Sequence, residues 1–339
     1  SGPVRSAGLW YVAPGGNDSE DCQSPTTACG TIDGAIAKAS PGDTIYAATG
    51  TYTGTDSTVV SLDKGLTLSG GWGWSGTLMV QNGISIIDGE GTRRGIVISS
   101  DVTATVEYFA VQDGFSSGVG GGIYNAGTLA LDHGVVRHNI ASGNGGGIFN
   151  SDGVITLNNS TVNDNTAGFS GGGISSNGRL TLNNSTVSGN TAGEGGGIHI
   201  RHSGPVFAAL NSSTVSNNKA NRGGGIHSDD SSASVRVVLR NSILAGNTAS
   251  AEDGPDCLGV LDSLGYNLLG HTSGCTFTSQ LGDLTNTGAG LGPLAGSPGY
   301  HPLLSESPAI DAGHPAGCWA STGLLSTDQR GFTRFGRCD

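Results

Sequence analysis

The chain has 339 residues and a formal net charge of −12, from 15 basic and 27 acidic side chains. Only three of the basic residues are lysines, so a nucleic-acid partner is not expected. Glycine contributes 61 residues and charged residues only 12%, a composition typical of disorder unless regularly spaced aliphatic residues build a core. The sequence contains no apolar run of 18 residues, so no membrane span is expected in this chain.

The first residues predict a strand and then a cap. Residues 8–15 form a candidate strand, and the segment from Thr31 predicts a short helix. In that helix Ile32 and Ile36 share one face, and a turn then leads to a strand at residues 44–47. We expect this helix to close the open end of a repetitive fold, where apolar core and strand edges would otherwise be exposed.

A repeat of about 25 residues occupies the middle of the chain. The tetrapeptide Gly-Gly-Gly-Ile ends at positions 123, 148, 174, 198 and 226, in steps of 25, 26, 24 and 28 residues. Each copy is followed by alternating apolar and polar residues, such as Leu180 and Leu182 against Thr181 and Asn183. This period of two indicates short strands buried on one face.

The repeat length selects the fold. It is too short for a propeller blade and too rich in strands for a leucine-rich repeat, which leaves one coil of a parallel β-helix. We therefore predict an all-β, right-handed parallel β-helix with a short N-terminal capping helix. Strand twist favours the right hand, which the family resemblance given below also implies.

An asparagine recurs three residues after an aliphatic residue in each unit. These residues are Asn139, Asn165, Asn190, Asn218 and Asn247. In a stacked fold we expect them to form a side-chain amide ladder, at a tight turn that requires left-handed backbone geometry. The five isoleucines of the repeat are expected to form an interior column.

Six cysteines lie outside the repeats, at Cys22, Cys29, Cys257, Cys275, Cys318 and Cys338. Fifteen pairings are possible, and proximity in the sequence favours 22 with 29, 257 with 275 and 318 with 338. Three such disulfides are typical of an extracellular protein, so we expect the chain to be secreted or attached to the cell surface. The expected organisation is a strand and cap at 1–43, coils at 44–250, and further coils with a disulfide-stapled cap at 251–339.

Several stretches resemble a known family. The opening "WYVAPGGND", the coils "GGGI…NNSTVSGNTA" and the endings "SPAIDAG" and "TDQRGFTRFGRCD" resemble bacterial secreted β-helix proteins of the pectate-lyase-like superfamily that carry a choice-of-anchor Q C-terminal region. The repeats are also similar to those of polymorphic outer-membrane adhesins. The family pattern continues after its final Cys-Asp with Ile-Gly-Ala-Phe-Glu, and this chain stops at Asp339. The resemblance implies the fold; lyases, hydrolases and adhesins all use it.

The best candidate for chemistry lies in the last two repeats. Alignment on Gly-Gly-Gly-Ile places Tyr124, Phe149, Ser175, His199 and His227 in one column. For an enzyme, the candidate catalytic residues are His199, His227, Arg201, Arg222 and Asp229, because imidazoles transfer protons and arginines bind an anionic substrate. Tyr124, Phe149, His202 and Asp230 are the candidate binding residues. The alternative is a solvated strand face that carries aromatic and polar side chains without a function.

The sequence contains two weaker clusters of polar residues. The stretch "LDHGVVRHN" contains Asp132, His133, Arg137 and His138, but neighbours in a strand point to opposite faces, which favours surface decoration. Glu252, Asp253 and Asp256 could bind Ca²⁺ through oxygen atoms, or could form an acidic loop. No other cofactor is expected.

The sequence favours a structural or adhesive role, through self-assembly or carbohydrate binding, over an enzyme. No complete catalytic set emerges from the alignment, whereas the adhesin-like repeat is regular throughout. The alternative is a polysaccharide lyase or glycoside hydrolase acting on an extracellular polymer. The expected partners are an extracellular polysaccharide or other copies of the chain. One form of self-assembly would be a head-to-tail filament in which the N-terminal "SGPVRSAGLWYV" pairs near Cys338 of another copy.

Overall fold

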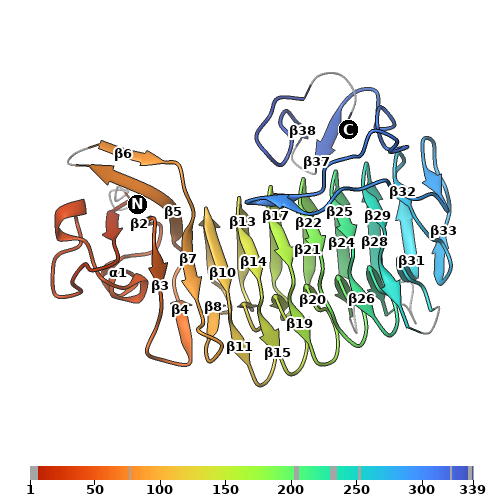
Figure 1. Cartoon of the computed structure of the whole chain (residues 1–339). Coiled ribbons are helices and arrows are strands. Elements are labelled where there is room, and N and C mark those ends of the chain that lie inside the picture. Colours follow the sequence, from red (N-terminus) through yellow and green to blue (C-terminus); the bar gives the residue numbers. More distant parts are fainter. Residues whose placement is uncertain are drawn as a thin grey trace, which may run out of the picture.

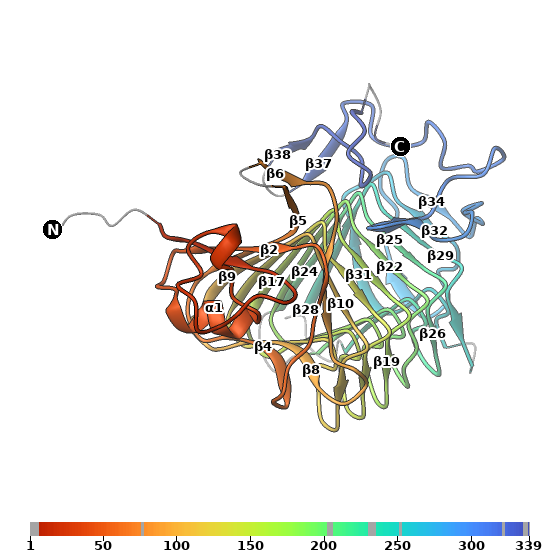
Figure 2. The same cartoon turned by 60° about the vertical axis from the view of Figure 1, so that its left-hand side comes forward.

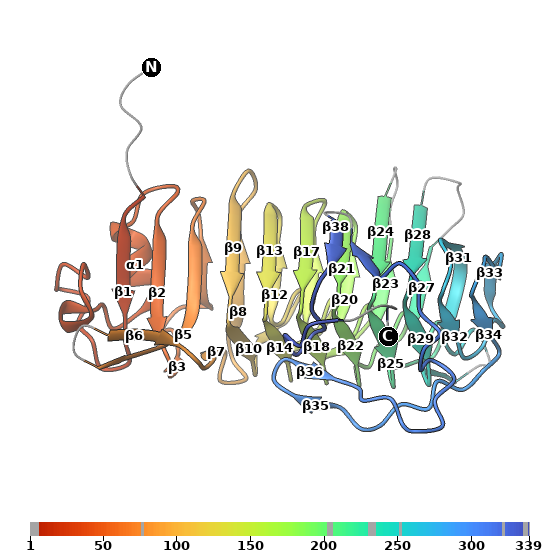
Figure 3. The ribbon, with the colours of Figure 1, turned by 90° about the horizontal axis from the view of Figure 1, so that it is seen from above.

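Each Gly-Gly-Gly-Ile unit folds into one coil of a right-handed parallel β-helix, which confirms the predicted fold class (Figure 1). The computed structural model describes residues 7–75, 78–201, 206–229, 235–250, 253–320, 323–334 and 338. Within these residues, parallel strands from successive coils stand side by side along the axis (Figures 2 and 3). Each coil contributes one strand to each of three faces, called faces 1, 2 and 3.

Face 1 carries the Gly-Gly-Gly-Ile strands. Its strands are β4 (Thr58–Leu62), β8 (Arg94–Ile98), β12 (Ile123–Asn125), β16 (Ile148–Asn150), β20 (Ile174–Ser176), β23 (Ile198–Ile200), β27 (Ile226–Ser228) and β31 (Cys257–Ser263). Face 2 comprises β1 (Leu9–Val12), β2 (Thr44–Ala48), β5 (Thr67–Ser75), β9 (Thr103–Glu107), β13 (Thr128–Asp132), β17 (Val154–Asn158), β21 (Arg179–Asn183), β24 (Val206–Asn211), β28 (Val235–Arg240) and β33 (Cys275–Phe277). The strand β6 (Leu78–Gln81) forms a hairpin with β5, and β31 pairs with strands of both faces.

Face 3 is a separate sheet. Its strands are β3 (Thr51–Tyr52), β7 (Ser85–Asp88), β10 (Phe109–Gln112), β14 (Val135–Arg137), β18 (Thr161–Asn163), β22 (Thr186–Ser188), β25 (Thr214–Ser216), β29 (Ile243–Ala245), β32 (Leu268–Leu269) and β34 (Leu284–Thr285). In several coils a two-residue strand follows the face 3 strand along the chain. These short strands are β11 (Phe115–Ser116), β15 (Ile140–Ala141), β19 (Thr166–Ala167), β26 (Lys219–Ala220) and β30 (Thr248–Ala249).

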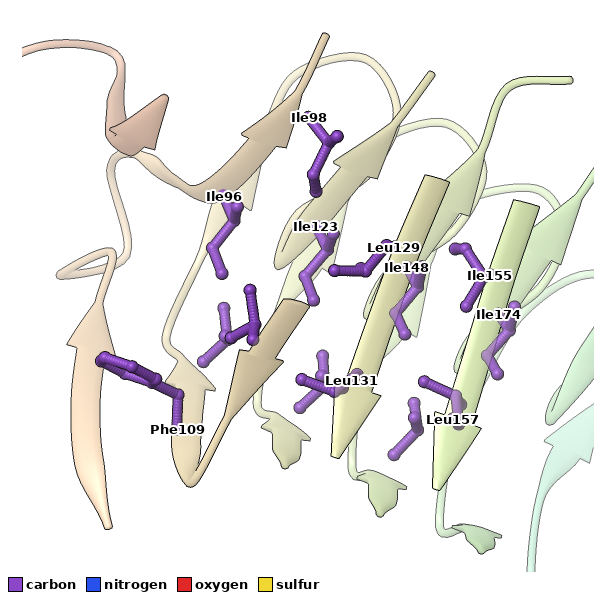
Figure 4. Close-up of a cluster of buried hydrophobic side chains, with 14 of the residues drawn as sticks. Ile96, Ile98, Phe109, Ile123, Leu129, Leu131, Ile148, Ile155, Leu157 and Ile174 are labelled. Carbon is purple, nitrogen blue, oxygen red and sulfur yellow. The ribbon is translucent and has the colours of Figure 1, made fainter. Parts of the chain in front are cut away.

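The repeated isoleucines form the interior column that the sequence predicts. Ile123, Ile148, Ile174, Ile198 and Ile226 pair in register on face 1, and each is 0% exposed. Leucines and isoleucines of face 2 point toward the same interior (Figure 4). Because equivalent residues of successive coils pack on one another, the core runs the length of the helix.

The asparagine ladder is confirmed. Asn139, Asn165, Asn190, Asn218 and Asn247 each donate a side-chain N–H to the next member at 2.9 Å, and the ladder ends at the carboxylate of Asp256. The tight turn with left-handed geometry is also observed. The residue with the positive φ is the one before each asparagine: His138, Asp164, Gly189, Asn217 and Gly246. The left-handed residue turns the chain, and the asparagine then points inward to the ladder.

The N-terminal cap forms as predicted. Helix α1 spans Ile32–Lys38, and the Thr31 hydroxyl accepts a hydrogen bond from the Gly34 N–H at 2.9 Å. Ile32 and Ile36 are buried and the helix packs against β1, β2 and β4. The strand β1 pairs with β2 on one edge, and on its other edge Tyr11 exchanges backbone hydrogen bonds with Cys22 and Cys29, so both edges are occupied within the same chain. Residues 1–6 of the segment predicted to mediate a filament lie outside the described residues.

All three predicted disulfides are present: Cys22–Cys29, Cys257–Cys275 and Cys318–Cys338. Such bonds persist in oxidising compartments, which supports the expected extracellular environment. Among the described residues, no helix is both long and apolar enough to cross a membrane.

After β34 the chain turns back along the outside of face 3. We call this segment, residues 286–320, 323–334 and 338, the strap. It contains two antiparallel pairs, β35 (Ala295–Gly296) with β36 (Gly299–Tyr300), and β37 (Cys318–Ala320) with β38 (Gly323–Leu325). Figure 3 shows the strap in blue beside β14, β18 and β22.

Candidate functional site

The predicted pairing of two histidines on face 1 is observed. His199 of β23 and His227 of β27 are register partners on adjacent strands, and their ring centroids lie 5.1 Å apart. Ser175 and Leu258 occupy the equivalent positions on either side. The histidine pair is therefore confined to two neighbouring coils.

Two carboxylates complete this cluster, which we call the histidine cluster: Glu194, His199, His227 and Asp229. Asp229 lies with one oxygen 3.4 Å from His199 Nε2 and the other 3.4 Å from His227 Nε2. Glu194 Oε2 lies 3.9 Å from His199 Nε2 and 3.8 Å from His227 Nδ1. One possible ligand atom from each residue lies within 4.8 Å of all the others, so the cluster could hold a metal ion.

The cluster is buried on one side and open on the other. The histidine side chains are almost fully buried, whereas those of Glu194 and Asp229 are 38% and 37% exposed. Burial, together with the neighbouring His199, lowers the pKa of His227, which therefore favours the neutral imidazole. The His199 imidazole holds the pKa of Asp229 below its usual range.

Both predicted arginines contact the cluster from outside. Arg222 occupies the position equivalent to Glu194 in the following coil and pairs with it. Its Nη1 lies 3.4 Å from Glu194 Oε1, and its Nε lies 3.3 Å from Asp253 Oδ2. Arg201 Nε lies 3.8 Å from Asp229 Oδ2. The structure thus brings together the five residues proposed as catalytic and adds Glu194. The sequence signal for Glu194 was its alignment with Arg222, one coil apart and directly before the glycines.

The four predicted binding residues do not form a binding surface among the described residues. Tyr124 and Phe149 stack on each other with centroids 5.9 Å apart, and Phe149 is only 8% exposed, so it offers little surface to a ligand. His202 and Asp230 lie outside the described residues.

The acidic loop that was proposed for Ca²⁺ is only partly described. Asp256 is fully buried; its Oδ1 accepts two hydrogen bonds from Asn247 and its Oδ2 accepts one from the His271 N–H. Burial raises the pKa of this carboxyl. Asp253 pairs with Arg222, and Glu252 lies outside the described residues. Asp256 therefore has a structural role as the end of the ladder.

A second candidate site, missed in the sequence, lies between the strap and the coils. Where each coil passes from face 2 to face 3, one residue adopts a left-handed conformation. These residues form the turn column: Tyr108, His133, Asn159, Asn184, Ser212, Asn241 and Tyr266, with φ between 48° and 60°. Asparagine suits this conformation, but tyrosine rarely adopts it.

Two cavities lie between the turn column and the strap. The larger, about 740 Å³, is bordered by Tyr108, His133 and Pro298 among others; the smaller, about 390 Å³, by Asn184, Asn241 and Tyr266. Tyr300, Gln329 and Arg330 of the strap border both, so the cavities adjoin. We call the two together the strap groove. The groove escaped prediction because it forms only when the distant strap folds back.

Buried hydrogen bonds hold the strap in place. Gln329 Nε2 donates to Thr161 Oγ1 at 3.1 Å and to Gly299 O at 2.8 Å, while Thr186 Oγ1 donates to Gln329 Oε1 at 2.8 Å. Arg334 Nη2 donates to Asn184 Oδ1 at 2.7 Å. These contacts preform the groove, which lowers the ordering cost of binding a ligand.

His301 predicts a pH dependence of strap attachment. Its Nδ1 lies 2.7 Å from Gly292 O and its Nε2 2.9 Å from Ser188 Oγ, and burial lowers its pKa. A histidine with a depressed pKa contributes stability above its unfolded pKa of about 6.5, and this contribution is lost as the pH falls through the folded value. We expect lower protection factors for the strap amides at pH 5 than at pH 7.5, after correction for the intrinsic exchange rate at each pH, and a smaller difference in His301→Asn. Equal differences in both proteins would contradict this role.

Comparisons with known proteins establish the fold. No protein-family model and no curated protein matches the chain. Among solved structures, the crystal structure of pectate lyase Pel9A is similar, with a TM-score of 0.57 and 14% identity over 98% of this chain and 89% of that chain. The chain therefore shares the parallel β-helix fold of that pectate lyase.

Proposed function

We propose that the chain is an extracellular adhesive β-helix protein that binds a neutral oligosaccharide in the strap groove. The observation that carries the proposal is the conformation of Tyr108 and Tyr266. Both hold positive φ, at 56° and 60°, in a column where asparagine would be less strained, and both line the groove. A strained backbone of this kind costs about 1–3 kcal/mol per residue and is concentrated at binding sites.

The lining suits a sugar. Sugars present hydroxyl groups and apolar ring faces, and the groove combines aromatic rings with amides and hydroxyls from Asn184, Ser212 and Gln329. Burial raises the pKa of Tyr108, so its phenol stays a hydrogen-bond donor. The Asn241 Nδ2 is a buried donor with no hydrogen-bond partner among the described residues, and it borders the smaller cavity.

The charges favour a neutral ligand. Apart from histidines, the charged residues that border the groove are Asp328, Arg330 and Arg334. Arg330 forms an ion pair with Asp328, and its guanidinium lies 5.0 Å from the centre of the Tyr300 ring. Arg334 is hydrogen-bonded to Asn184. These three residues carry a formal charge of only +1, and both guanidinium groups are already engaged by protein groups, so the groove offers no free cluster of cations to select an acidic sugar.

The test is binding to an array of neutral and acidic oligosaccharides, followed by calorimetry with the best neutral probe. Tyr108→Asn and Tyr266→Asn each restore the residue that the turn column prefers, so both variants should fold with equal or greater stability. We expect each to weaken binding at least about tenfold, because an aromatic wall is removed. Phe169→Asn is the matched control, since Phe169 is 69% exposed and does not border the groove.

Two results would overturn the proposal. One is unchanged affinity in both tyrosine variants. The other is an array in which only acidic sugars bind.

A polysaccharide lyase or glycoside hydrolase is the second candidate. It is favoured by the fold shared with a pectate lyase and by the arginines beside the histidine cluster. A uronate polymer incubated with the protein would then develop the absorbance of an unsaturated product, and His227→Ala would abolish it. We expect no such turnover.

A further inference from the structure

His199 and His227 are buried imidazoles with unmet bonding capacity. Their side chains are 2% and 6% exposed. His199 Nδ1 and His227 Nδ1 have no hydrogen-bond partner among the described residues, and the nearest group to His199 Nε2 is the Asp229 carboxylate, at 3.4 Å and without good hydrogen-bond geometry. A buried polar group left without a partner costs about 1–3 kcal/mol. Unsatisfied nitrogens gathered in one place indicate that the cluster accommodates something besides its own side chains.

The spacing of the four residues matches a coordination sphere. Ligand bonds of 2.0–2.2 Å in a tetrahedral site place donor atoms about 3.3–3.5 Å apart. Asp229 Oδ2 already lies 3.4 Å from His199 Nε2, and Asp229 Oδ1 lies 3.4 Å from His227 Nε2. Glu194 Oε2 lies 3.9 Å from His199 Nε2 and 3.8 Å from His227 Nδ1, so its partly exposed side chain must shift toward the ion, and one potential donor atom from each residue already lies within 4.8 Å of the others.

We propose that Glu194, His199, His227 and Asp229 form a binding site for a divalent transition-metal ion of the zinc class. Two of the four donors are imidazoles, which suit Zn²⁺, Co²⁺ or Ni²⁺, whereas Ca²⁺ is bound by oxygen atoms. Two carboxylates balance the charge of a divalent ion. The site differs in place and in metal from the acidic loop that the sequence suggested for Ca²⁺.

The arginines support such a site from its outer side. Arg222 contacts Glu194 through Oε1, which leaves Oε2 directed at the histidines. Arg201 contacts Oδ2 of Asp229, while Oδ1 lies nearest to His227. Outer contacts of this kind orient ligating carboxylates and commonly change metal affinity about 10–100-fold.

The ion would join two neighbouring coils. His199 comes from β23 and His227 from β27, and Glu194 and Asp229 precede and follow these strands along the chain. A four-ligand site supplied entirely by protein is typical of a structural metal. The site shares no residue with the lining of the strap groove, so metal binding and sugar binding can be tested independently.

The experiment is titration of metal-free protein with Zn²⁺ by calorimetry and with Co²⁺ by visible absorption. We expect one ion per chain, an intense Co²⁺ spectrum of tetrahedral type, and a rise in Tm with Zn²⁺ that EDTA reverses. His199→Ala and His227→Ala should each weaken Zn²⁺ binding at least about 100-fold, and Arg222→Ala about 10-fold or more.

His138→Ala is the matched control, because His138 is an exposed histidine 4.0 Å from an aspartate and should leave Zn²⁺ affinity unchanged. Glu194→Gln guards against misfolding, since Glu194 is partly exposed; it should fold like the wild type and bind Zn²⁺ more weakly. The proposal is overturned if Zn²⁺ does not bind, if Ca²⁺ binds more tightly, or if the histidine variants that retain the fold bind as the wild type does.

Discussion

Ile174→Asp is expected to prevent cooperative folding. Ile174 lies in the middle of the interior column, is 0% exposed, and packs between Ile148 and Ile198 of the adjacent coils. A carboxyl in that position either stays charged and unpaired or is forced to take up a proton, and both cost several kcal/mol. The total stability of a folded protein is about 5–15 kcal/mol, so one such residue removes much of it. Circular dichroism during urea denaturation should show no cooperative transition.

Val154→Asp is the matched control for this variant. Val154 begins β17 and is 36% exposed, so the same change places the carboxyl in water. We expect this variant to unfold cooperatively with a Tm close to that of the wild type. A folded, cooperative Ile174→Asp protein would contradict the stacked core.

Asn190→Ala is expected to cause the second largest loss of stability. The Asn190 side chain donates to Val162 O, Ser188 O and Asn218 Oδ1, and its own oxygen accepts from the N–H and Nδ2 of Asn165. The residue is 0% exposed, so alanine leaves several buried groups without partners, each costing about 1–3 kcal/mol. We expect a loss of about 3–5 kcal/mol in the free energy of unfolding, measured by urea denaturation.

The exposed Asn221 provides the comparison for the ladder. Asn221→Ala should change the free energy of unfolding by less than about 0.5 kcal/mol. If the two alanine variants are equally stable, the ladder does not hold the coils together.

The coils could be predicted because their determinants are local and periodic. The alternation of Leu180 and Leu182 identifies a strand and the face that it buries. The position of Ile174 in its repeat gives the register with the neighbouring coils. The ladder and the three disulfides followed from the same spacing arguments. The identity of the left-handed residue in the ladder turn did not, since sequence spacing alone does not show whether Asn165 or the preceding Asp164 takes that position.

The sites were harder to predict, each for a different reason. Alignment of the repeats paired His199 with His227, because register partners on adjacent strands must meet. Glu194 was missed because it lies in the turn before β23, outside the aligned strand column, where its repeat alignment with Arg222 was the signal that pointed to it. The strap groove was missed because contacts such as Thr186 with Gln329 join residues 143 positions apart, and no local pattern reports them. The available signal was a tyrosine, Tyr108 or Tyr266, at the turn position that asparagine occupies in three other coils.

The most direct test of the proposed function is a crystal structure of the chain with the best neutral oligosaccharide from the array. The proposed function predicts sugar density between the turn column and the strap, in contact with Tyr266 or Tyr108 and with Tyr300, and a hydrogen bond from Asn241 Nδ2 to a sugar oxygen. Density along face 1 beside His199 and His227, with an empty strap groove, would contradict the proposal and support the enzyme instead.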